Sequence, residues 1–77
     1  MERPNEKKDP VTAEGTVRSF DAGMGNGFIQ REGDTDVFVN YEAIRGENPR
    51  TLTAGDRVQV VVVDGPRGPR ARSVRKL

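Results

Sequence analysis

Two short segments that read as strands and carry aromatic side chains, close together in the sequence, constrain the fold of this chain more than any other feature. Residues 25–30 read Gly-Asn-Gly-Phe-Ile-Gln and residues 36–41 read Asp-Val-Phe-Val-Asn-Tyr. The five residues between them include Gly33, which is suited to the positive φ of a tight turn. Successive side chains on a strand point to opposite faces, so the pattern predicts a hairpin with one buried face.

The alternation also predicts which side chains of this hairpin are exposed. The members placed toward the core are aliphatic: Ile29, Val37 and Val39. Phe28, Phe38 and Asn40 then face solvent, and exposed rings on neighbouring strands form a surface on which unpaired bases stack. A shift of one residue would bury the two phenylalanines, but it would expose the three aliphatic side chains.

The rest of the chain is strand-like from residue 11 onward. Strands are predicted at residues 15–21, 28–31, 36–40, 56–64 and 70–76, with one helical turn at 41–44, a long loop at 45–54 and a shorter one at 65–69. Residues 11–77 are expected to form one all-β domain, and a closed antiparallel barrel is favoured because closure removes exposed strand edges. Residues 1–10 are polar and are expected to form a flexible tail, since they bury too little apolar surface to offset the entropy of ordering.

The fourth predicted strand carries a run of valines. Val58, Val60 and Val62 alternate toward the core, which leaves Val61 and Val63 facing outward. Two interpretations remain open for this outward pair. It either covers a seam of the barrel or forms a surface for a protein partner or a second copy of the chain.

The composition argues against several classes of function. The chain has no Cys and no His, so it lacks the usual zinc ligands and the commonest general base, and neither a metal site, a cofactor nor catalysis is expected. No apolar run approaches the length needed to cross a bilayer, and no signal-peptide pattern is present, so a cytoplasmic protein is expected.

Charge is distributed unevenly along the chain. The 13 Lys and Arg residues nearly balance the 12 Asp and Glu residues, which gives a net charge of +1. Basic residues nevertheless gather near the C-terminus: Arg67, Arg70, Arg72, Arg75 and Lys76. This clustering is compatible with a phosphate backbone as ligand and equally with a solvated strand end.

Several of these motifs together resemble the cold shock domain family of bacterial single-strand-binding proteins. The matching segments are residues 15–20, 25–29, 36–41, 43–44, 65–69 and 74–77, in the family's order and spacing. The resemblance implies a small five-stranded OB-fold barrel that binds single-stranded RNA or DNA on its first three strands. It further implies an RNA chaperone or a regulator of transcription or translation, with no enzyme activity and no small-molecule substrate.

The resemblance also implies a set of nucleic-acid-binding residues. Carried over position by position, they are Arg18, Phe20, Asn26, Phe28, Phe38, Asn40, Tyr41 and Arg67. Phe20 is equally compatible with a place at the edge of the core. The aromatic character of the family's site is kept at Phe28, Phe38 and Tyr41. Its basic character is kept at Arg18 and Arg67.

Five positions depart from the family's pattern. Ser19 stands where Trp is usual, Asn26 where an aromatic is usual and Asn40 where His is usual. Met24 stands where Lys is usual, and Pro49 lies near the position of a further Phe. Because each stacked base contributes about 1–3 kcal/mol, weaker binding than the family norm is expected, with a stronger salt dependence.

The loss of these rings leaves two alternatives open. Arginines stack on bases as well as pairing with phosphate, so those lying on the binding face would compensate for lost rings. The candidates are Arg31, Arg50, Arg70 and Arg72. In the alternative function, the barrel has lost nucleic-acid binding and serves as a protein-interaction or regulatory module through Val61, Val63 and the C-terminal strand.

Overall fold

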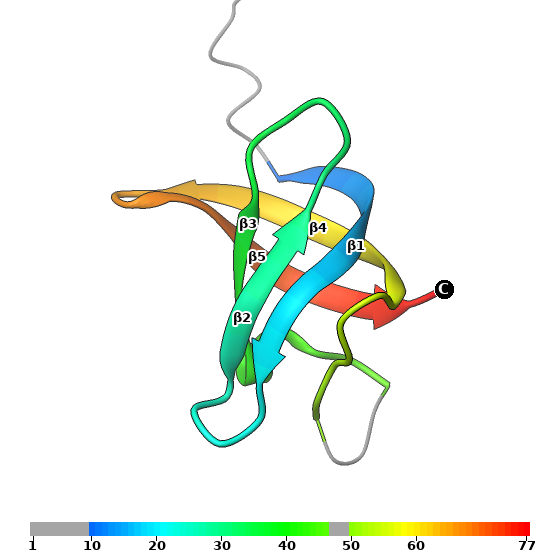
Figure 1. The fold of residues 1–77 in the computed structure, drawn as a ribbon. Coiled ribbons are helices and arrows are strands. Elements are labelled where there is room, and N and C mark those ends of the chain that lie inside the picture. Colours follow the sequence, from blue (N-terminus) through cyan, green and yellow to red (C-terminus); the bar gives the residue numbers. More distant parts are fainter. Residues whose placement is uncertain (1–9, 47–49) are drawn as a thin grey trace, which may run out of the picture.

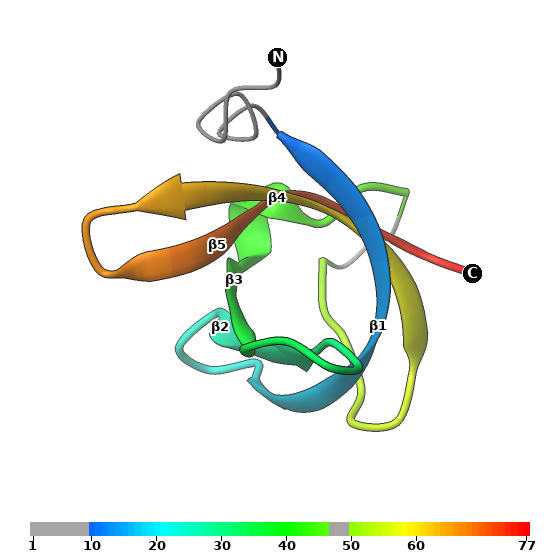
Figure 2. The ribbon, with the colours of Figure 1, turned by 90° about the horizontal axis from the view of Figure 1, so that it is seen from above.

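The structure, a computed structural model, describes residues 10–46 and 50–77. Its elements are β1 (Val11–Asp21), β2 (Asn26–Gln30), β3 (Val37–Asn40), the 3₁₀ turn η2 (Tyr41–Ala43), β4 (Arg57–Gly65) and β5 (Gly68–Lys76). The strands form a closed barrel in the order β1-β2-β3-β5-β4, and β4 pairs with β1 to complete the ring (Figures 1 and 2). The predicted all-β, five-stranded barrel is confirmed.

One strand pair differs from the predicted antiparallel arrangement. β3 and β5 pair in parallel, with Phe38 opposite Arg70, whereas the other four pairs are antiparallel. The reason is geometric: strand directions cannot alternate all the way around a closed ring with an odd number of strands. A closed five-stranded barrel therefore contains at least one parallel pair.

β1 links the two halves of the barrel because it pairs with a different strand along each half of its length. Residues 11–16 pair with β4 and residues 16–21 pair with β2. A β-bulge between Val17 and Ser19 lies near the change of partner, and bulges bend a strand locally. The prediction that this strand starts at Gly15 was wrong, because its first residues are held by β4, which is distant in sequence.

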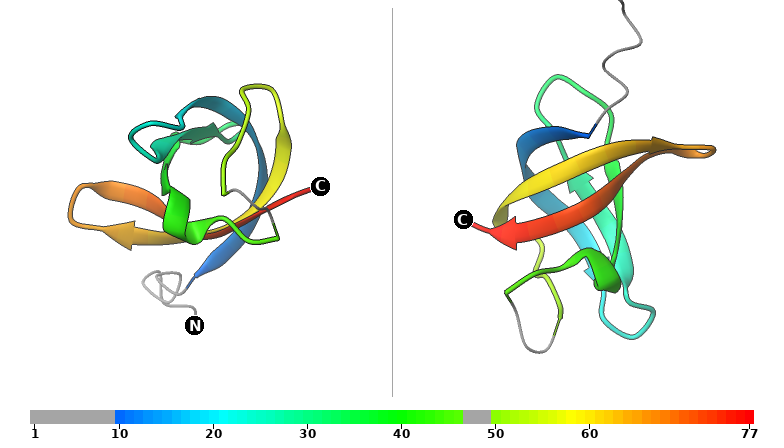
Figure 3. Two further views of the ribbon diagram at one scale, coloured as in Figure 1. Left: turned by 90° about the horizontal axis from the view of Figure 1, so that it is seen from below. Right: turned by 180° about the vertical axis from the view of Figure 1, so that it is seen from behind.

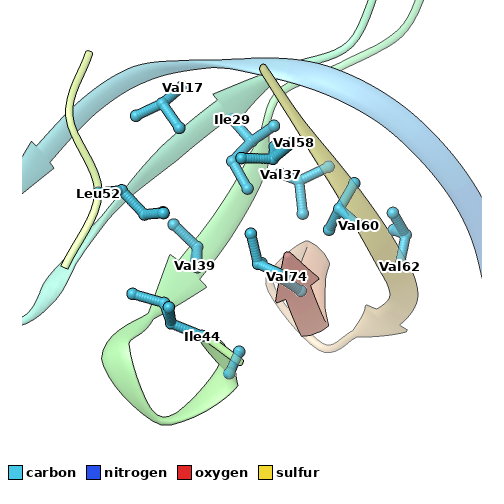
Figure 4. Close-up of a cluster of buried hydrophobic side chains, with 12 residues drawn as sticks. Val17, Ile29, Val37, Val39, Ile44, Leu52, Val58, Val60, Val62 and Val74 are labelled. Atoms are coloured by element: carbon cyan, nitrogen blue, oxygen red, sulfur yellow. The ribbon is translucent and has the colours of Figure 1, made fainter. Parts of the chain in front are cut away.

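The core is built entirely from aliphatic side chains (Figure 4). Its members are Val17, Ile29, Val37, Val39, Ala43, Ile44, Leu52, Val58, Val60, Val62, Ala71 and Val74. Ile29, Val37 and Val39 are 0% exposed, as the alternation predicted. In the described part of the chain no polar or charged residue is buried, so burial of apolar surface is the main force that closes the barrel.

The hairpin between β4 and β5 is tighter than predicted. In place of a loop over residues 65–69, the strands continue until Gly65 pairs with Gly68, which leaves Pro66 and Arg67 at the tip. Gly68 has φ of 119°, a conformation that favours glycine. The hairpin projects sideways from the barrel in every view, so Arg67 is carried away from the core (Figures 1 and 3).

Parts of two predictions lie outside the described residues. They are residues 1–9 of the predicted tail and residues 47–49 of the long loop, which include Pro49. Within residues 10–46 and 50–77, no helix is long and apolar enough to cross a membrane. The same residues contain no group of three or more acidic, His or Cys side chains placed to hold a metal ion.

Candidate nucleic-acid interface

Two phenylalanines lie side by side on the outer face of the barrel. Phe28 of β2 is opposite Phe38 of β3, and the two residues are 43% and 37% exposed. Their ring centroids are 5.7 Å apart with an angle of 70° between the planes, which is an edge-to-face contact. Since their neighbours Ile29 and Val39 fill the core, alternation holds both rings in solvent.

The row that contains these rings continues onto the strands at either side. Ser19 of β1 is opposite Phe28, and Arg70 of β5 is opposite Phe38. Neighbouring strands are roughly 4.7–4.9 Å apart, so these four side chains form a continuous row. From β1 to β5 the row therefore offers a hydroxyl, two rings and a guanidinium.

Gly27 allows β1 and β2 to come close together beside this row. A Cβ atom at position 27 would lie 2.6 Å from the Cα of Phe20 and would also collide with the carbonyl oxygen of Ser19. Only glycine fits such an approach without a shift of the backbone. The placement of Ser19 next to Phe28 therefore depends on this glycine.

A groove of about 480 Å³ separates the phenylalanine pair from the β4–β5 hairpin. Its lining residues are Phe28, Phe38, Gly65, Pro66, Arg67, Gly68, Pro69 and Arg70. This volume falls within the roughly 300–1,000 Å³ of typical ligand clefts. The rings present flat apolar faces and Arg67 and Arg70 place positive charge beside them, a combination that is suited to bases and phosphates.

Asn26 of β2 and Asn40 of β3 are opposite each other, two residues along their strands from the phenylalanine pair. The side chain of Asn40 already has a structural role, because its Oδ1 accepts a hydrogen bond of 3.0 Å from the backbone N–H of Glu42 and caps η2. Its amide NH₂ group is the part that remains to donate to a base edge. Asn40 thus combines a cap with a position next to the rings.

Tyr41 forms a separate exposed aromatic surface at the end of β3. Its backbone N–H donates to the carbonyl oxygen of Gly25 at 2.8 Å, and the residue is 44% exposed. A Cβ at Gly25 would lie 2.9 Å from the ring's Cδ1, so the ring packs directly on this glycine. Met24 and Arg50 help Tyr41 to line a small pocket of about 230 Å³.

Arg18 is exposed, but an acidic neighbour offsets part of its charge. Its Nε lies 2.8 Å from Oδ2 of Asp36. Exposed ion pairs of this kind contribute only about 0–1 kcal/mol, so a phosphate can compete with the carboxylate. Arg31 is turned into the β2–β3 connection instead, where its Nε donates to the carbonyl oxygen of Thr35 at 3.0 Å and its Nη1 lies 3.3 Å from the Asp34 carboxylate.

The structure also places Phe20 and Arg70. Phe20 is half-buried and packs against the core, and its role as a ligand contact stays a prediction. Arg70 entered the prediction only as a conditional substitute for a lost ring, yet it stands next to Phe38 and lines the groove. Its position follows from the parallel β3–β5 pairing, which no local sequence pattern reveals.

Comparison with known proteins decides the family. A sequence profile of the 'Cold-shock' DNA-binding domain matches residues 13–77. The chain belongs to the cold shock domain family. Cold shock domains are nucleic-acid binders without catalytic activity, which confirms the prediction that this protein is not an enzyme.

Similar cold shock proteins occur in several bacteria. Cold shock-like protein CspLB of Listeria monocytogenes is 49% identical over 63 residues, which cover 82% of this chain and 96% of that protein. Cold shock protein CspA of Staphylococcus saprophyticus is 48% identical over 64 residues, with 83% and 97% covered. Cold shock protein CspA of Staphylococcus aureus strain USA300 is 47% identical over 64 residues, with the same coverage. The cold shock domain therefore accounts for nearly the whole described barrel.

Proposed function

We propose that this cold shock domain captures single-stranded RNA or DNA on the outer face of β2 and β3, and that it acts in the cytoplasm as an RNA chaperone or a regulator of transcription or translation. The observation that carries the proposal is the solvent-exposed pair of Phe28 and Phe38 beside a basic groove. Exposed rings cost stability in water, whereas they bind flat bases well.

Each part of the interface has a distinct role in this proposal. The rings of Phe28 and Phe38 stack on bases, and Tyr41 provides a further stacking surface. Arg67 neutralises phosphate from the hairpin tip. Bases held in this way are unavailable for pairing, so RNA hairpins are kept open by equilibrium binding without energy input.

Affinity is proposed to be lower than in family members with a complete set of rings. Ser19, Asn26 and Asn40 offer hydrogen bonds where those members offer rings, and hydrogen bonds exchanged with water contribute less than stacking. The carboxylate of Asp36, 2.8 Å from the Nε of Arg18, also offsets part of the charge that this arginine presents to a phosphate. A larger share of the binding energy then comes from the remaining charges, which makes binding more sensitive to salt.

The stacking role of Phe38 can be tested with three substitutions at one position. Phe38→Ala and Phe38→Leu both remove the ring, and a loss of about 1–3 kcal/mol, or roughly fivefold to 150-fold in affinity, is expected. Phe38→Tyr keeps the ring and should bind as the native protein does. Binding is followed by the fluorescence anisotropy of a labelled oligothymidine, and circular dichroism verifies that each variant is folded. Unchanged affinity in the alanine and leucine variants would exclude base stacking on the pair of Phe28 and Phe38, the proposed stacking platform.

The alternative function as a protein-interaction module receives less support. Val61 and Val63 face outward as predicted, but both are half-buried, so they offer little apolar surface to a partner. Stable interfaces need a larger contiguous surface than two half-covered side chains. Absence of oligonucleotide binding even at low salt would revive this alternative.

A further inference from the structure

We propose that the bound strand continues from the phenylalanine pair across β5 into a second groove, where Arg70 and Arg72 each neutralise one phosphate. This inference rests on the proposed single-strand binding. It adds the path of the bound strand across the barrel and a second subsite. It is carried by the register of β3 and β5, by the lining of the two grooves and by the distribution of ion pairs.

The second groove, of about 450 Å³, is next to the first, and the two share Arg70 in their linings. Its lining residues are Asn40, Glu42, Ala43, Val63, Arg70, Ala71 and Arg72. Arg70 lines both grooves, and it is opposite Phe38. Because β3 and β5 run in parallel, the step from Phe38 to Asn40 on one strand accompanies the step from Arg70 to Arg72 on the other.

The local geometry of β5 directs both arginines outward. Ala71 between them is only 8% exposed and belongs to the core, so its neighbours project to the opposite side. Residues two apart on a strand are roughly 6–7 Å apart, which allows each guanidinium a phosphate of its own. A bulge pairs Val62 with Ala71 and Val61 with Ser73, so Arg72 is the extra residue of β5, and it is exposed there as Arg70 is.

The positive charge along this path is not offset by ion pairs. Three arginines elsewhere on the barrel are paired with acids: Arg18 with Asp36, Arg31 with Asp34 and Arg57 with Glu14. No carboxylate of the described residues lies within ion-pair distance of Arg67, Arg70 or Arg72. Arg67, Arg70 and Arg72 therefore place three uncompensated charges along the two grooves, from the hairpin tip to the second groove.

One acidic residue, Glu42, also lines the second groove. Its carboxylate lowers the positive potential there and repels a phosphate that approaches Arg72. Neutralising Glu42 should therefore change affinity in the opposite direction from neutralising either arginine. This opposite sign gives the proposal a second, independent test.

The first test measures the salt dependence of binding to an oligothymidine of about eight nucleotides, within the range of site sizes of OB folds. Arg70→Gln and Arg72→Gln should each weaken binding about fivefold at low salt and reduce the slope of log K against log salt by about 0.7. Arg70→Lys and Arg72→Lys keep the charge and should keep the slope. Arg75→Gln is the matched control, because Arg75 lies opposite Gln59 near the far end of the same strand.

The second test uses Glu42→Gln, which should raise affinity about twofold to threefold by removing the repulsion. Its control is Glu14→Gln, which removes the same charge from the β1–β4 face, where Glu14 pairs with Arg57. A change no larger than that of Glu14→Gln would contradict a path through this groove.

The outcomes separate this inference from the function on which it rests. If Phe38→Ala weakens binding but Arg70→Gln and Arg72→Gln change the slope no more than Arg75→Gln does, the second subsite is wrong and the platform stands. If the lysine variants lose the slope as the glutamine variants do, neutralisation of phosphate is wrong. If the native protein binds no oligonucleotide at low salt, both the stacking platform and the second subsite are wrong.

Discussion

Ser19 determines how far the aromatic row extends across the barrel. It is exposed and stands opposite Phe28, so a ring at this position would lie next to the phenylalanine pair. Serine keeps the site polar on the β1 side, while Arg70 makes it basic on the β5 side. The proposed binding surface is therefore centred nearer to β5 than to β1.

Restoring a ring at this position should strengthen binding. Ser19→Trp adds one stacking surface to the row, and a gain of about 1–3 kcal/mol is expected. The native chain has no Trp, so quenching of the new indole by an oligonucleotide reports binding directly. Thr12→Trp is the control, because Thr12 is exposed on the same strand but pairs with Val61 of β4. Equal affinity in the two variants would show that position 19 lies outside the site.

Among the elements, β2 and β3 could be predicted from the sequence, and the pairing of β3 with β5 could not. Alternation is a local property, so Ile29 inward and Phe28 outward followed from a few neighbouring residues. The exposure of the rings was therefore predictable from the sequence alone. In contrast, the start of β1 and the neighbour of Phe38 depend on strands far away in sequence, and Arg70 was left without a defined position for that reason.

The junction of β3 with η2 allows the structural and binding roles of Asn40 to be separated. Asn40→Ala removes the cap on Glu42 N–H and should lower the free energy of unfolding by about 0.5–1 kcal/mol. Asn40→Asp keeps an acceptor oxygen, so it should retain stability while its charge repels phosphate and weakens binding. Urea unfolding and oligonucleotide titration measure the two effects. A loss of stability in Asn40→Asp equal to that in Asn40→Ala would contradict the cap.

At the scale of the whole molecule, the barrel separates stability from binding. Its aliphatic core lies inside the ring of strands and both grooves lie on the outer face, with only Ala43 and Ala71 belonging to the core and to a groove lining. A chain of this size buries a modest fraction of its surface, so its stability is small. A ligand that binds only the folded barrel then adds a large fraction to that stability.

This separation predicts that an oligonucleotide rescues a damaged core. Val60 is 0% exposed and lines neither groove, so Val60→Ala should cost about 2–3 kcal/mol of stability while the dissociation constant of the folded protein stays unchanged. An oligonucleotide at about 100 times its Kd adds about 2.7 kcal/mol and should return the variant's Tm to near the native value measured without ligand. Thermal unfolding with and without oligothymidine measures this shift. The double variant with Phe38→Ala should gain much less at the same oligonucleotide concentration, because the ligand then stabilises the folded barrel through fewer stacked bases; an equal gain would place the binding surface away from the rings.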